Sequence, residues 1–188
     1  MTRAAKLGAA KGRAGTPSSR FDGAGSPAPV AQLMRLLDDA FSGPAWHGPS
    51  LRGSLRGATA AEALWRPAPG RNCVWDLVLH AAYGKHLVIH RLDPVASPRF
   101  PRPLARAWWP ALPDDPDAAA WRRDRALLDE YHRRLVEVVA ELSPARLLVT
   151  LAGARHTLGQ EVAGVALHDV YHAGQIRLVR RLYVERGR

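Results

Sequence analysis

The chain has 188 residues and a single cysteine, and its composition is rich in Ala, Arg, Leu, Gly and Pro, with few β-branched residues outside short Val runs. This length fits one domain with an appendage, the composition favours helices over sheet, and one cysteine excludes an intramolecular disulfide and fits a reducing compartment. No apolar run reaches the roughly 18 to 20 residues of a membrane-spanning helix. No apolar segment follows the basic N-terminus, as one would in a secretory signal. We therefore expect a cytoplasmic protein with no membrane partner.

The net charge of +10 is spread along the chain, since residues 1–29 contribute five basic side chains against one acidic one and the remainder contributes +6. Such a charge attracts anions, either nucleic acid or an anionic small molecule. However, no basic cluster is interleaved with aromatic residues, as single-strand binding requires. Solvated arginine on helix surfaces is therefore the preferred interpretation, and a nucleic-acid partner is not favoured.

Residues 1–28 contain almost no large apolar side chain and cannot bury enough surface to offset chain entropy. We expect them to form a flexible basic tail in front of a domain at 29–188. In that domain the first helix is predicted over 29–41, with Leu33, Leu36, Leu37 and Phe41 as its apolar stripe. Shorter helices are expected near 46–56 and 58–65.

A second long helix is predicted over 72–92, with Asn72 as its N-cap. At about 100° per residue, its buried face carries Cys73, Leu77, Ala81, Gly84 and Val88. His80 lies at the edge of that face and can look inward. His86 and His90 fall on the outer side, which we expect to face solvent.

The second helix is followed by a Pro-rich connection at 93–116 that carries Trp108 and Trp109. A structureless loop of this length is unusual in a compact domain. It suits a four-helix bundle with one long crossover, in which helices two and three run parallel.

The third helix is predicted over 117–142, with Trp121, Leu128, Leu135 and Val139 as its stripe and His132 half exposed beside it. Residues 147–151 fit a short strand or an extended link. The fourth helix is predicted from 157 to about 184, opening on a capping box formed by Thr157 and Gln160. Its buried stripe includes His168 and His172.

Two helices thus present three inward histidines: His80, His168 and His172. His168 and His172 are four residues apart, so their side chains lie one above the other on a helix. Metal sites in bundles are built from side chains on facing helices, and three imidazoles leave a position for water or a substrate atom. A single histidine on an apolar face is more often a hydrogen-bonded core residue, so the prediction depends on all three converging.

The last-helix motif, His168-x-x-x-His172-x-Gly174-Gln175-Ile176 followed by Arg180-Arg181-Leu182, resembles the final helix of the DinB/YfiT-like family. The first half resembles that family at Trp46-His47-Gly48-Pro49, Pro67-Ala68-Pro69-Gly70 and Val74 to His80, and the likeness covers about residues 30–185. The resemblance implies an all-α four-helix bundle in up-down-down-up order with a long helix 2–3 crossover. It also implies a divalent metal, zinc or nickel, held by His80, His168 and His172, and a homodimer.

The family includes S-transferases that use a low-molecular-weight thiol as cosubstrate, a thiol-dependent isomerase and many members without a known activity. The resemblance therefore implies a metal-dependent enzyme, a thiol S-transferase or a hydrolase, that acts on a small-molecule substrate. The alternative is a non-catalytic stress-response or DNA-damage-response protein whose metal is structural or absent.

No catalytic residue is identified beyond two weak candidates, Glu161 and Gln175. Glu161 fits better as an N-terminal-turn carboxylate favoured by the helix dipole. Gln175 can hydrogen-bond at the metal rim or to another helix. Asp169 can orient an imidazole or pair with a surface arginine, and Tyr83 and Cys73 are expected to be core residues.

Overall fold

A computed structural model describes residues 25–95 and 97–187, and nearly all of the predicted tail lies outside this range. The described chain is all-α apart from two short strands, which confirms the predicted fold class. The long helices are α1 (Ala28–Phe41), α4 (Val74–Leu92), α5 (Ala118–Ala140) and α7 (Leu158–Glu185). Short elements fill the connections: α2 (Leu51–Ser54), α3 (Ala60–Leu64), β1 (Leu104–Arg106), β2 (Trp109–Pro110) and α6 (Pro144–Leu147).

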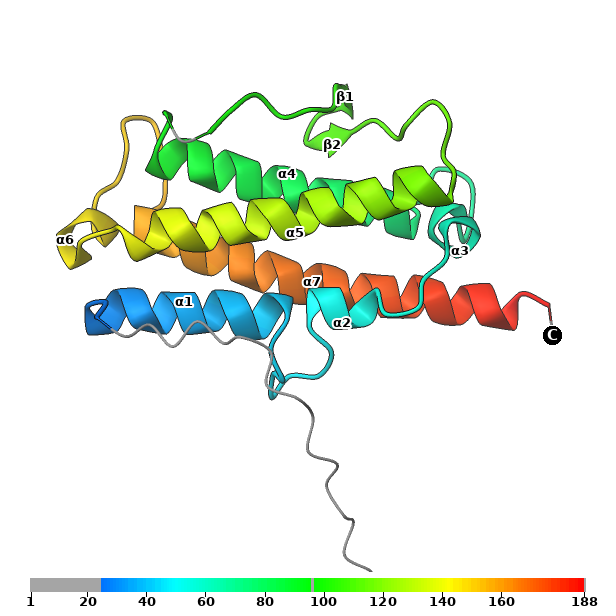
Figure 1. Ribbon diagram of the computed structural model, residues 1–188, viewed down its shortest axis with the longest axis horizontal. Coiled ribbons are helices and arrows are strands. Elements are labelled where there is room, and N and C mark those ends of the chain that lie inside the picture. The colour runs from blue at the N-terminus through cyan, green and yellow to red at the C-terminus, as the bar shows by residue number, and fades with distance from the viewer. Residues whose placement is uncertain (1–24, 96, 188) are drawn as a thin grey trace, which may run out of the picture.

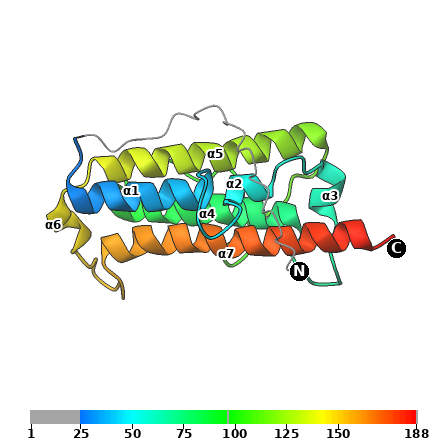
Figure 2. The same ribbon diagram turned by 90° about the horizontal axis from the view of Figure 1, so that it is seen from below.

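The four long helices form a bundle in which α1 and α7 run one way and α4 and α5 run the other (Figure 1). Seen from below, α1 lies between α5 and α7, and α2 continues along α7 beyond the end of α1 (Figure 2). α4 packs against both α5 and α7. The order is therefore up-down-down-up, and the segment between α4 and α5 returns along the length of the bundle, as predicted.

Local sequence explains where the helices that carry the histidines begin. Thr157 and Gln160 form the predicted capping box of α7. The predicted cap of α4 was wrong by one residue, because Cys73 Sγ and not Asn72 accepts the backbone N–H of Asp76, while the Asp76 carboxylate accepts the N–H of Cys73. The side chain of Asn72 instead accepts a hydrogen bond from Arg106 of the crossover.

The crossover is more ordered than its proline content predicted. Within it β1 and β2 pair as a short antiparallel hairpin with Leu104 opposite Pro110 and Arg106 opposite Trp109. Trp108, at the turn, has a φ of 67°, a left-handed conformation that is uncommon outside glycine. Such a backbone costs of order 1 kcal/mol or more and persists where surrounding contacts hold it. The hairpin lies against α4.

Two predictions about the helix faces were wrong. Leu36 was assigned to the buried stripe of α1, but it is 37% exposed, and Val30, Met34 and Leu37 form the buried face with Phe41. His132 was expected to be half exposed, but it is buried and its ring stacks on Phe41 with 3.8 Å between centroids. The reason is that α5 packs against both α4 and α1, so its buried stripe is wider than a single contact requires.

The expected short strand or extended link at 147–151 is not a full strand. The helix α6 ends at Leu147, and the segment after it reaches α7 through an isolated antiparallel bridge between Thr150 and Thr157. In the part of the chain that the structure describes, no helix combines the length and the hydropathy needed to cross a bilayer.

A candidate metal centre between α4 and α7

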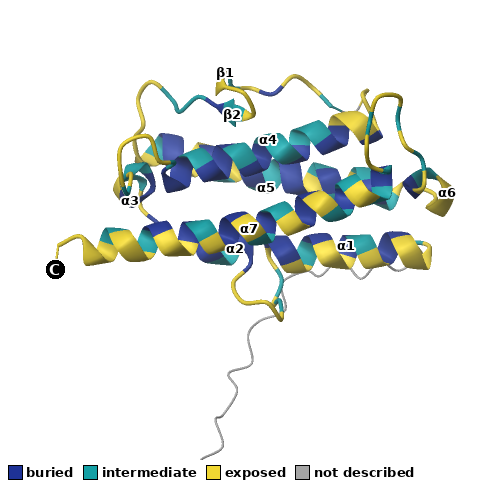
Figure 3. Ribbon diagram, turned by 180° about the vertical axis from the view of Figure 1, so that it is seen from behind, coloured by how far each residue is buried: buried dark blue, intermediate teal, exposed yellow. Residues whose placement is uncertain are grey.

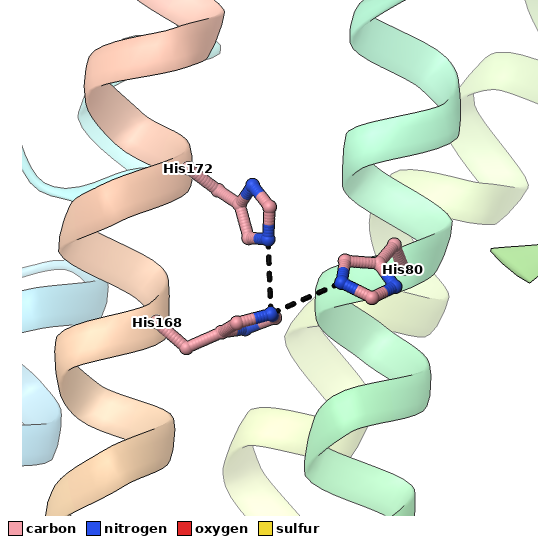
Figure 4. Close-up of side chains that lie close together, drawn as sticks. All are labelled: His80, His168 and His172. Carbon is pink, nitrogen blue, oxygen red and sulfur yellow. Dashed lines mark hydrogen bonds between the residues drawn. The ribbon is translucent and has the colours of Figure 1, made fainter. Parts of the chain in front are cut away.

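The structure brings the three predicted histidines together from two helices (Figure 4). His80 comes from α4, and His168 and His172 come from successive turns of α7. The Nε2 atom of His168 lies 3.1 Å from Nε2 of His80 and 2.9 Å from Nε2 of His172. Three ring nitrogens on two elements therefore point at one small volume, a group that could hold a metal ion.

Hydrogen bonds at the other ring nitrogens fix the form of two imidazoles. Nδ1 of His80 lies 2.7 Å from the backbone carbonyl of Trp108, and Nδ1 of His172 lies 2.6 Å from the side-chain oxygen of Gln175. Both partners are acceptors, so each Nδ1 must carry its proton and donate. In a neutral imidazole the Nε2 atom is then unprotonated and has a free lone pair, which is the form that binds a metal.

This protonation pattern leaves the cluster with more lone pairs than protons can satisfy. His80 and His172 both present lone pairs to Nε2 of His168, which can donate at most one hydrogen. Nδ1 of His168 is buried and has no hydrogen-bond partner among the described residues. A divalent cation among the three Nε2 atoms resolves the conflict, and zinc–nitrogen bonds of about 2.0–2.1 Å in tetrahedral geometry place the nitrogens about 3.3 Å apart. The donor set and its spacing thus fit a metal.

Burial keeps the cluster neutral. It lowers the pKa of His168 to about 3 and that of His172 to about 4, with the other histidines adding to the effect at His168 and the Gln175 hydrogen bond opposing it at His172. Burial also lowers the pKa of His80, against the hydrogen bond to Trp108. Neutral imidazoles are the metal-binding form.

The crossover hairpin covers one side of the centre. The ring of Trp109 stacks on His80, with 4.1 Å between centroids and 10° between planes. The guanidinium group of Arg106 lies over the ring of Trp109, 4.6 Å from its centroid. Together with the hydrogen bond to the backbone carbonyl of Trp108, these contacts hold the ring of His80 in place from outside the bundle. No role was predicted for Trp108 or Trp109.

A buried ion pair that begins at the residue after His168 was not predicted. Asp169, next to His168 in the sequence, is fully buried and pairs with the fully buried Lys85 of α4. Both interpretations of Asp169, an imidazole partner or a surface ion pair with arginine, were therefore wrong. Of the 27 basic residues only Lys6, Lys11 and Lys85 are lysines, which was the available signal. Beside it, a Cβ on Gly84 would lie 3.4 Å from Cε1 of His168, so glycine gives that ring its room.

The other histidines and candidate residues take different roles. His90 is exposed as predicted, but His86 is half-buried against Phe100 and Tyr131 beneath the crossover, not on an open face. Glu161 pairs with Arg91 in the first turn of α7, which agrees with its interpretation as an N-terminal-turn carboxylate. Gln175 is the candidate that the structure places at the cluster.

The fold and the site define an all-α bundle with a three-histidine group between its second and last long helices. A sequence profile of the DinB superfamily matches residues 46–176, which is more than half of the chain. The chain belongs to the DinB superfamily. No match was found among the curated proteins or among the solved structures.

Proposed function

We propose that this protein binds one divalent metal ion through His80, His168 and His172 and uses it in an S-transferase reaction with a low-molecular-weight thiol. The observation that carries the metal site is the convergence of three Nε2 atoms, two of which are fixed as lone pairs by the acceptors at Nδ1. Zinc and nickel are the ions that we propose. Imidazole nitrogen suits both of them, as it also suits copper and iron.

A metal in such a site lowers the pKa of a bound thiol, so that thiolate forms at neutral pH. In the transfer, sulfur bonds to an electrophilic carbon of the second substrate, the leaving group departs with the bonding pair, and the thiol proton passes to solvent. The thiol must come from outside the chain. Cys73 is buried at the start of α4, and burial raises its pKa to about 11.

The metal site is tested by comparing bound metal in the wild type, His172→Ala and His90→Ala after loading with zinc or nickel and desalting. We expect about one ion per chain in the wild type and in His90→Ala, whose histidine is exposed, and a strong loss in His172→Ala. Equal metal content in wild type and His172→Ala would overturn the site.

The transferase activity is tested separately, by incubating the metal-loaded protein with several biothiols and model electrophiles and following thioether formation by mass spectrometry. We expect a product that depends on His172 and on the metal. If the metal-loaded protein forms no thioether with any thiol, the transferase proposal fails while the metal site stands.

Burial of the cluster favours the second candidate, a non-catalytic protein with a structural metal. His172 is only 3% exposed, and Trp109 covers His80. A structural ion is fully enclosed by protein, whereas a catalytic one keeps a free position. Cobalt substitution distinguishes them, because an added thiol that binds cobalt gives a sulfur-to-metal charge-transfer band and a closed site gives none.

Gln175 should tune the metal affinity. Gln175→Ala removes the acceptor of the His172 Nδ1 proton, and loss of such an outer hydrogen bond weakens metal binding by about tenfold or more. Gln175→Glu keeps an acceptor and should bind as well as the wild type, and Gln32→Ala on the exposed side of α1 serves as the matched control. A competitive titration with a chromophoric chelator measures the metal affinities of the wild type and the three variants. An unchanged affinity in Gln175→Ala would contradict the orienting role.

A further inference from the structure

The crossover hairpin, residues 103–111, is a compact unit on the outside of the bundle. β1 and β2 pair within it, and the N–H of Ala111 donates to the carbonyl of Pro103 over 2.8 Å, which closes the base of the hairpin. β1 is exposed along its length, whereas β2 is partly buried on the side of α4 (Figure 3). The hairpin is therefore closed by its own hydrogen bonds.

Both ends of the hairpin are anchored to the bundle. Before it, Phe100 is buried, and Arg102 pairs with one carboxylate oxygen of Asp124 on α5, whose other oxygen accepts the indole N–H of Trp75. After it, Leu112 packs against the hydrophobic core. The hairpin can therefore move between two fixed ends while the four long helices stay packed.

The contacts of the hairpin with α4 are centred on the metal ligand His80. The carbonyl of Trp108 accepts the Nδ1 proton of His80, and the ring of Trp109 stacks on the same imidazole. Arg106 lies over the ring of Trp109 and donates a hydrogen bond to Asn72, just before α4 begins. One imidazole is thus shared by the hairpin, through Nδ1 and a ring face, and by the histidine cluster, through Nε2.

A shared imidazole couples the hairpin to the metal. A cation at Nε2 makes the Nδ1 proton of His80 a stronger donor, and the carbonyl of Trp108 in turn makes Nε2 a better ligand. Such a linkage is reciprocal, so the factor by which the hairpin raises metal affinity equals the factor by which the metal favours the closed hairpin. The left-handed backbone of Trp108 opposes closure and must be offset by these contacts.

We propose that the crossover hairpin is a lid on the metal centre, held closed by a metal on His80 and opening to let a thiol or another small ligand reach the cluster. The lid depends on the metal site of the proposed function but not on S-transfer. Opening removes the ring of Trp109 and the carbonyl of Trp108 from His80 and uncovers the cluster on that side. A centre that is covered in the closed state can in this way still exchange its ion or accept a ligand.

Hydrogen exchange of the wild type, followed by mass spectrometry with and without zinc, tests the coupling. Zinc should slow exchange in peptides from 103–111 about tenfold or more, the usual effect of a partner of a metal-bound histidine. Peptides from 144–149, around α6 at one end of the bundle, should exchange equally in both states (Figure 1). A wild type that binds no zinc would overturn the lid together with the metal site. Bound zinc with unchanged exchange in the hairpin would overturn the lid alone.

Variants of Trp109 test its contact with His80. Trp109→Ala removes the stacked ring and Trp109→Phe keeps one, while Trp46→Ala, at a fully exposed tryptophan between α1 and α2, is the matched control. Release of zinc to excess chelator should be about tenfold or more faster in Trp109→Ala and close to the wild-type rate in the other two variants. Circular dichroism checks that each variant folds. Release at the wild-type rate from folded Trp109→Ala would contradict the lid.

A reversible lock tests whether the hairpin must open. In a Cys73→Ser background, which keeps a side chain suited to the N-cap, Asn72→Cys and Arg106→Cys place thiols at two positions whose native side chains touch. A bis-methanethiosulfonate reagent joins them through disulfides. The locked protein should release zinc on the order of tenfold more slowly than the Cys73→Ser parent, because only the open state releases the ion, and reduction should remove the difference. Equal release from the locked protein and the parent would exclude a lid.

Discussion

Replacing Lys85 with methionine should lower the free energy of unfolding by about 3–5 kcal/mol, because it leaves the carboxylate of Asp169 buried without its partner. Both side chains are 0% exposed, and the ammonium contacts both carboxylate oxygens. Burial lowers the pKa of Lys85 and raises that of Asp169, while their mutual attraction and hydrogen bonding oppose both shifts. The two charges are therefore tolerated only together.

Denaturant unfolding of the metal-free protein measures this effect. Methionine is the suitable substitution, since it keeps the length of the side chain that lies near the ring of Phe41. The matched control is Arg133→Met, which breaks exposed ion pairs with Glu130 and Glu137 and should change the stability far less than Lys85→Met does.

The double variant Lys85→Met/Asp169→Leu separates the cost of an unpaired charge from the contribution of the pair. Replacing a buried ion pair by apolar residues of similar volume is often neutral or stabilising, so the double variant should recover most of the loss. A double variant as unstable as Lys85→Met alone would show that the lost stability comes from packing and not from the buried carboxylate.

The bundle could be predicted from the sequence because local patterns indicate both where its helices lie and in which order they run. Apolar periodicity located the four long helices, and the proline content of the crossover set their order. The histidine cluster was also predictable, since helical wheels turn His80, His168 and His172 inward and hide His90 from them.

The parts that could not be predicted depend on partners far apart in sequence or on the backbone. Lys85 and Asp169 are 84 residues apart, and a wheel for one helix does not show which charge on another helix will face it. The acceptor for His80 is a carbonyl in a left-handed turn, which no side-chain pattern reveals. His132 was placed at the edge of its helix face because the second neighbour of α5 could not be counted.

The buried position of His132 should reduce the stability of the fold in acid. His132 is buried against Phe41, and its Nδ1 has no hydrogen-bond partner among the described residues. Burial lowers its pKa from 6.5 to about 2, and the charges of Lys85 and Arg52 act in the same direction. The folded protein therefore keeps His132 neutral at pH values where the unfolded chain protonates it.

Because the unfolded state binds the extra proton, the stability that neutral His132 contributes to the folded protein is fully present above pH 6.5. It is lost as the pH falls below that value. The loss is about 1.4 kcal/mol per pH unit, so between pH 7.5 and pH 4.5 this group alone should remove about 3 kcal/mol. His132→Phe keeps an aromatic ring beside Phe41 and removes the titration. The variant should therefore lose about 3 kcal/mol less than the wild type over this range.

The comparison uses denaturant unfolding with a chelator present, so that the metal-binding histidines stay metal-free and titrate equally in both proteins. His168 and His172 lower acid stability in the same direction, but their contribution cancels in the difference between wild type and variant. His90→Phe, at an exposed histidine on α4, controls for the loss of a histidine as such. Equal loss of stability in wild type and His132→Phe would mean that position 132 admits a proton, and with it water, into the contact between α5 and α1.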